Sequence, residues 1–285
     1  MMPMKLSIMT RVYWRCYRWP GRTFNFTLPQ ILNRIAQSGF QHVDLCEYPI
    51  EFWPLDMTEK DIKKLKEKLQ SLNLKVSGIT VPTFSPGLEI LPEEEDRRII
   101  VNRLKRAVEL TSALNGETVM YGISPMPVYA TEEEAYKWTV NLFHECSDLA
   151  EKLGVNLAIE FVNNRFPTSE SIIEFLDAVD SENIGLCLEV GNVRARPPKE
   201  TLMEHLRKCG ERIKLVHVND PANYEWLKSI NVNMLETMKA LCDLGYEGPI
   251  VTESLHNSIP CSELDKEIAK TAKYLRGLIE ETRSN

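Results

Sequence analysis

The sequence contains no hydrophobic run that approaches the roughly 20 residues needed to span a membrane. Residues 1–6 are too short and too polar at their flanks to form a signal peptide. The seven cysteines include no CxxC pair and are scattered along the 285 residues, a distribution typical of reduced thiols in a cytosol. These absences predict a soluble, cytoplasmic protein that does not use a membrane as its partner.

The chain also lacks the features of proteins that recognise nucleotides or nucleic acids. Its formal net charge is −7, whereas a protein that binds a phosphate backbone usually presents a basic face. No glycine-rich dinucleotide-binding or P-loop fingerprint follows any strand-like segment, and no low-complexity linker divides the chain. The sequence therefore argues against a nucleic-acid partner and against a Rossmann fold.

What the chain does contain is a regular alternation of strand-like and helix-like segments. Segments rich in Val, Ile and Leu alternate with longer amphipathic segments, which predicts a parallel sheet built from βα units. The strand-like segments lie at residues 5–10, 42–47, 75–80, 118–122, 156–160, 185–189, 214–217 and 249–253. Eight such units in a chain of this length predict an α/β fold with a single (β/α)8 TIM barrel domain over residues 1–285.

The last four strand-like segments each end in a side chain that can bind a metal: Glu160, Glu189, His217 and Glu253. The C-terminal ends of barrel strands meet at one mouth, and neighbouring strands lie about 4.8 Å apart, so these side chains can share one cation. Three carboxylates and one imidazole suit Mn best, with Mg, Co or Zn as alternatives. The sequence therefore predicts one divalent metal ion as the cofactor.

These strand ends resemble the metal motifs of the xylose isomerase-like TIM barrel superfamily. The resemblance rests on Ala158-Ile159-Glu160, Cys187-Leu188-Glu189-x-x-Asn192, His217-Val218-Asn219-Asp220 and Thr252-Glu253. The superfamily includes sugar isomerases, ketose 3-epimerases, inosose-processing enzymes and the endonuclease IV branch, and most of the chain follows its pattern of βα units.

The resemblance implies roles for individual residues. Glu160 and Glu253 match the two glutamates that bind the metal and, in ketose epimerases, exchange the substrate proton, whereas His217 matches the imidazole ligand. Glu189 stands where the epimerases usually have Asp. Removing a proton next to a carbonyl creates an enediolate, which a divalent cation stabilises by several kcal/mol. A positioned carboxylate that accepts and returns this proton contributes roughly 10²–10⁴-fold to the rate.

Asn192 departs from the pattern, because the epimerases have His three residues after the acid of the sixth strand. Asn can hydrogen-bond a substrate hydroxyl, but it does not titrate near neutral pH. That His is a ligand in the branches with two or three metals, so its replacement favours a single metal. The endonuclease alternative loses a ligand in the same way and is disfavoured further by the acidic chain.

Further candidates for substrate binding lie near the predicted mouth. Trp14 belongs to an aromatic and Arg-rich loop at residues 13–24, which can stack on a sugar and bind a phosphate or carboxylate. The alternative for this loop is a contact in a homo-oligomer. Asn163 follows Glu160 and can bind a hydroxyl, and His256 follows Glu253 closely enough to reach the mouth.

Two acids have structural alternatives. Glu47, which ends the second strand-like segment, can help in the site or form an ion pair with an Arg. Asp220 is predicted to cap a turn or support a ligand rather than to bind the metal itself.

The main hypothesis is a metal-dependent isomerase or epimerase that acts, through an enediolate, on a small ketose or a related hydroxycarbonyl compound. A dehydratase is an alternative on the same barrel, because enediolate formation also precedes β-elimination. A degenerate barrel that binds a sugar-like molecule without turnover is a third possibility, and Asn192 is the residue that keeps it open.

Overall fold

The computed structural model describes residues 4–13, 17–18, 23–24, 26–48, 52–82, 88–126, 129–161, 165–191, 200–229 and 232–284. Eight parallel strands form a closed barrel, in the spatial order β1-β10-β9-β8-β7-β6-β5-β4, and β1 closes the ring by pairing with both β10 and β4. The strands are β1 (Lys5–Met9), β4 (His42–Cys46), β5 (Lys75–Val81), β6 (Thr118–Gly122), β7 (Asn156–Glu160), β8 (Ile184–Glu189), β9 (Ile213–Asn219) and β10 (Pro249–Ser254). The predicted (β/α)8 fold is confirmed.

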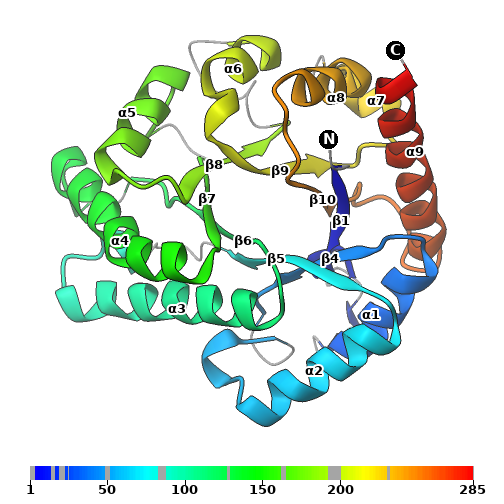
Figure 1. Cartoon of the computed structure of the whole chain (residues 1–285), viewed down its shortest axis with the longest axis horizontal. Coiled ribbons are helices and arrows are strands. Elements are labelled where there is room, and N and C mark those ends of the chain that lie inside the picture. Colours follow the sequence, from blue (N-terminus) through cyan, green and yellow to red (C-terminus); the bar gives the residue numbers. More distant parts are fainter. Residues whose placement is uncertain are drawn as a thin grey trace.

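The helices form a ring outside the barrel (Figure 1). They are α1 (Leu28–Gln37), α2 (Glu59–Ser71), α3 (Glu94–Ala113), α4 (Glu132–Leu153), α5 (Ser169–Val179), α6 (Leu202–Cys209), α7 (Tyr224–Ser229), α8 (Met234–Asp243) and α9 (Leu264–Ser284). Short 3-10 helices lie at η1 (Thr10–Tyr13), η2 (Pro54–Asp56), η3 (Leu88–Ile90) and η5 (Gly210–Arg212). The short strands β2 (Tyr17–Arg18) and β3 (Thr23–Phe24) form a separate antiparallel two-stranded sheet.

Local sequence explains where several helices begin. The side chains of Thr58, Thr131 and Thr201 each accept a hydrogen bond from a backbone N–H of the first helical turn. In each case the carboxylate of an acidic residue three positions later accepts a hydrogen bond from the backbone N–H of the threonine. Such capping boxes satisfy backbone donors that have no partner within the helix. The helices that follow β4, β6 and β8 are therefore defined by their own first residues.

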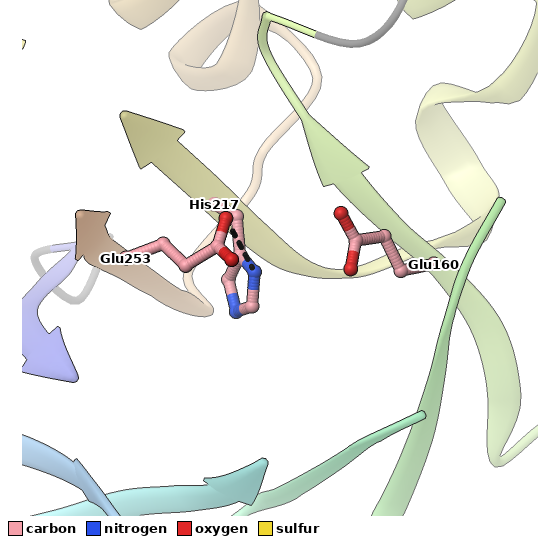
Figure 2. Close-up of side chains that lie close together, drawn as sticks. All are labelled: Glu160, His217 and Glu253. Carbon is pink, nitrogen blue, oxygen red and sulfur yellow. Dashed lines mark ion pairs between the residues drawn. The ribbon is translucent and has the colours of Figure 1, made fainter. Parts of the chain in front are cut away.

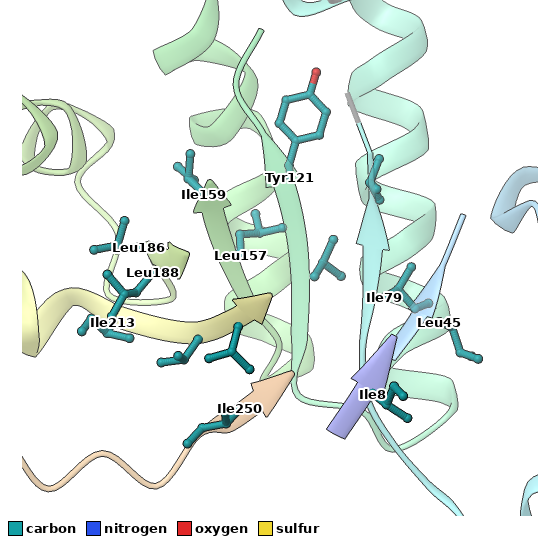
Figure 3. Close-up of a cluster of buried hydrophobic side chains, with 14 of the residues drawn as sticks. Ile8, Leu45, Ile79, Tyr121, Leu157, Ile159, Leu186, Leu188, Ile213 and Ile250 are labelled. Carbon is teal, nitrogen blue, oxygen red and sulfur yellow. The ribbon is translucent and has the colours of Figure 1, made fainter. Parts of the chain in front are cut away.

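The barrel strands alternate between two environments because successive side chains point to opposite faces. One face packs outward against the helices and includes Ile8, Leu45, Ile79, Tyr121 and Leu157 (Figure 3). The other face fills the interior with a separate layer of buried side chains: Met9, Cys46, Met120, Ala158, Cys187, Leu215 and Val251. This layer forms the floor beneath the C-terminal mouth.

Among the described residues no helix is both long enough and apolar enough to cross a membrane. The structure describes six of the seven cysteines: Cys46, Cys146, Cys187, Cys209 and Cys242 carry free thiols, whereas Cys261 is disulfide-bonded. The expectation of reduced thiols throughout is therefore wrong at Cys261. Spacing along the chain could not reveal this, because a disulfide depends on which residues the fold brings together.

Candidate metal centre and active site

Three of the four predicted ligands meet at the barrel mouth. Glu160, His217 and Glu253 each offer a ligand atom, and these atoms lie within 4.8 Å of one another. In Figure 2 the two carboxylates extend from β7 and β10 toward each other and toward His217. Each of these residues stands two positions after a member of the interior layer, namely Ala158, Leu215 and Val251. The period of two along β7 and β9 therefore directs Glu160 and His217 into the barrel. Glu253 lies at an irregularity of β10 and reaches the same group.

His217 is the most informative member of the group. Its side chain is 0% exposed, and neither Nδ1 nor Nε2 has a hydrogen-bond partner among the residues that the structure describes. Burial lowers the pKa of His217, against the opposing effect of the Glu253 charge, so the imidazole is neutral at pH 7 and can ligate a metal through nitrogen. Burying polar atoms without partners is costly. A cation bound between His217 and the two carboxylates would supply the missing partner.

Glu253 is held through both of its carboxylate oxygens. Arg11, from η1, donates from Nη1 to Oε1 at 3.1 Å. Oε2 lies 3.8 Å from Nδ1 of His217 and accepts a hydrogen bond from Nδ2 of Asn219 at 3.3 Å. One oxygen therefore faces the guanidinium at the mouth, and the other faces the group of candidate ligands.

Glu189 ends β8 and is buried, but it is not a member of the three-residue group. Its Oε1 accepts a hydrogen bond from Asn219 Nδ2 at 2.8 Å. The chain turns tightly here, since a Cβ added at Gly191 would lie 3.2 and 3.3 Å from the two carboxylate oxygens of Glu189. The role of Glu189 as a fourth ligand remains a prediction.

Glu47 and Asp220, for which the sequence also allowed structural roles, both bind structural partners. Glu47 is buried and accepts a hydrogen bond from Arg103 Nε at 2.6 Å, while the ring of Trp53 covers the Arg103 guanidinium at 4.7 Å. The ion-pair alternative for Glu47 therefore holds. Asp220 accepts a hydrogen bond from Asn223 Nδ2 at 2.8 Å, as expected for a residue that stabilises a turn.

The predicted substrate-binding residues have different positions. His256 is exposed, and its Nδ1 accepts a hydrogen bond from the backbone N–H of Ser258 at 3.2 Å. Trp14, Asn163 and Asn192 lie outside the described residues. The substrate-binding roles of all four remain predictions.

The sequence reasoning missed an acid inside the barrel, Asp44, which lies on β4 two residues before the interior Cys46. Asp44 is 0% exposed, and Thr80 Oγ1 donates to its Oδ1 at 2.7 Å. No described residue forms a hydrogen bond with its Oδ2. Burial raises the pKa of Asp44 to about 7, and the charge of Glu253 acts in the same direction. Side chains two positions apart on a strand point to the same face, so the inward-facing Cys46 could have indicated that Asp44 also points into the barrel.

Arg11 and Asn219 were also missed as members of the site. Arg11 follows the first strand directly, and its side chain is 50% exposed at the mouth. Asn219 stands two positions after His217, so the same alternation that directs His217 inward also directs Asn219 inward.

The chain matches the family described as "Xylose isomerase-like TIM barrel" over residues 32–278. A ketose 3-epimerase of Arthrobacter globiformis is 24% identical over 261 residues, which cover 87% of this chain and 84% of that protein. An inosose isomerase of Bacillus velezensis is 22% identical over 213 residues, or 73% of each chain.

Similarity to solved structures extends over nearly the whole fold. D-psicose 3-epimerase from Clostridium cellulolyticum H10, solved with D-tagatose, superposes with a TM-score of 0.78 at 18% identity and covers 97% of this chain and 99% of that one. This likeness concerns the fold. Taken with the match over residues 32–278, it leads to one conclusion: the chain belongs to the xylose isomerase-like TIM barrel family.

Proposed function

We propose that this protein is a divalent-metal-dependent epimerase or isomerase of a small ketose or a related hydroxycarbonyl compound. The observation that carries the proposal is the buried His217, which lies beside the carboxylates of Glu160 and Glu253. Within the described parts of the chain, neither of its ring nitrogens has a hydrogen-bond partner. Oxygen and imidazole donors without a thiolate favour Mn, with Mg, Co or Zn as alternatives.

The relatives support an enzyme of this class. They include ketose 3-epimerases and inosose isomerases that align with most of this chain. Their activities favour an enzyme over a barrel that only binds a sugar-like molecule. The acidic site likewise suits a neutral polyhydroxy ligand and a cation better than nucleic acid.

Glu160, His217 and Glu253 would hold the cation, with Glu189 as a fourth ligand. When bound, a divalent cation stabilises negative charge that develops on a substrate carbonyl oxygen. Glu160 approaches the site from β7 and Glu253 from β10, so one carboxylate can remove the proton next to the carbonyl and the other can return it to the opposite face. Arg11 keeps one oxygen of Glu253 fixed while this exchange takes place.

The decisive experiment combines metal analysis with proton exchange. The purified protein should bind Mn²⁺, Mg²⁺, Co²⁺ or Zn²⁺ and should then incorporate solvent deuterium into one or more members of a ketose panel. Absence of any bound or stabilising metal would remove the basis of the proposal. Metal binding and ketose binding without exchange would instead support a non-catalytic barrel, and a product lighter by one water would support the dehydratase alternative.

The acid–base assignment has its own test. Glu160→Gln and Glu253→Gln remove the carboxylates that would move the proton, and each should abolish deuterium incorporation. Full exchange in both variants would contradict the assignment.

A further inference from the structure

Asn219 connects two acids of the site through its side-chain amide. Its Nδ2 donates to Oε1 of Glu189 at 2.8 Å and to Oε2 of Glu253 at 3.3 Å. An amide nitrogen carries two hydrogens, so each carboxylate can receive one. The two acids come from β8 and β10, and Asn219 comes from β9, which lies between these strands in the barrel.

Ser254 fixes which way this amide points. The hydroxyl of Ser254 donates to Oδ1 of Asn219, which leaves Nδ2 directed toward the carboxylates. The register between β10 and β9 shifts between Thr252 and Ser254, so that Ser254 stands opposite Asn219 and Glu253 is the extra residue of the bulge. Bulges of this kind re-aim side chains near active sites.

This arrangement offsets the repulsion between carboxylates at the site. The carboxylates of Glu160, Glu189 and Glu253 gather at one mouth, where like charges repel one another. Hydrogen bonds donated to ionised carboxylates are stronger than those between neutral groups and also restrict rotation of the acceptor. The amide of Asn219 therefore stabilises Glu189 and Glu253 close together without adding a charge.

We propose that Asn219, oriented by Ser254, is a positioning residue that holds Glu189 and Glu253 so that both can bind the same divalent cation. This inference rests on the metal-dependent function proposed above and extends it to residues outside the predicted ligand set. It also explains how Glu189, which lies outside the group of three, is linked to it. Substitution of residues that hydrogen-bond a metal ligand typically costs about 10–100-fold in metal affinity.

The test measures Mn²⁺ binding by calorimetry, together with the thermal unfolding temperature of each metal-free variant. Asn219→Leu keeps a similar side-chain size but donates no hydrogen bond, and we expect it to weaken Mn²⁺ binding by about 10–100-fold. Asn183→Leu is the matched control, because Asn183 is also half-buried and donates to the carbonyl of Val155 at the opposite end of the barrel. This control should leave Mn²⁺ affinity unchanged.

Ser254 provides a second, milder variant in case Asn219→Leu does not fold. Ser254→Ala removes the hydroxyl that orients the amide and should weaken Mn²⁺ binding, whereas Ser254→Thr retains a hydroxyl and should restore it. Unchanged Mn²⁺ affinity in Asn219→Leu and Ser254→Ala would overturn this inference alone, as would a lower unfolding temperature without any loss of affinity. Failure of the wild-type protein to bind any divalent metal would overturn the proposed function itself, and this inference with it.

Discussion

Replacing Asp44 with Asn should raise the free energy of unfolding at alkaline pH. The gain should be smaller at acidic pH. The carboxyl group of Asp44 is fully buried, and one of its oxygens has no hydrogen-bond partner in the described part of the chain. Burial raises the pKa of Asp44 from 3.8 to about 7. Asn resembles the protonated carboxyl group in shape and remains neutral at every pH of interest.

The sign of the effect follows from proton binding. Between pH 4 and pH 7, roughly, folded Asp44 holds a proton that the unfolded chain has already released, so the free energy of unfolding falls as the pH rises. Each pKa unit corresponds to about 1.4 kcal/mol. The shift from 3.8 to about 7 therefore costs the wild-type protein about 4 kcal/mol once the pH is well above 7.

The assay is urea unfolding of the metal-free protein at a series of pH values. The stability of Asp44→Asn relative to wild type should increase by about 3 kcal/mol between pH 5 and pH 9, because part of the cost is already present at pH 5. Asp56→Asn serves as the control, since Asp56 is an exposed acid in η2, and it should show no comparable trend. A stability difference for Asp44→Asn that does not change with pH would refute the reasoning.

Three further predictions concern the site and its surroundings. Saturating Mn²⁺ should raise the unfolding free energy by about 2.7 kcal/mol at 100 times its Kd, and His217→Ala should remove most of this gain in a thermal-shift titration; an equal gain in the variant would exclude His217 as a ligand. Arg103→Met leaves the buried Glu47 without the guanidinium that pairs with it and should lower the free energy of unfolding by about 3–5 kcal/mol in urea unfolding. Arg106→Met, the control, removes a partly exposed guanidinium and should cost less. Arg11→Met should lower kcat while the fold remains intact by circular dichroism, because Glu253 loses the donor on Oε1; an unchanged kcat would show that this contact is dispensable.

The sequence by itself determined the barrel and the three candidate ligands that lie together at its mouth. Strand-like segments alternate with amphipathic helix-like segments, which predicts βα units, and eight such units close into one barrel. Because the C-terminal ends of barrel strands meet at one mouth, side chains that end consecutive strand segments can be identified as neighbours without coordinates. This is why Glu160, His217 and Glu253 were predicted together and lie together.

Only the tertiary structure decided which residues support those ligands. Arg11 and Glu253 are 242 positions apart and meet because β1 closes the barrel against β10. Asn219 reaches Glu189 and Glu253 with its orientation set by Ser254, which a bulge places opposite it. Alternation specifies the face of a strand, but ring closure and bulges determine the neighbours on that face, and these depend on contacts between strands that are distant in sequence.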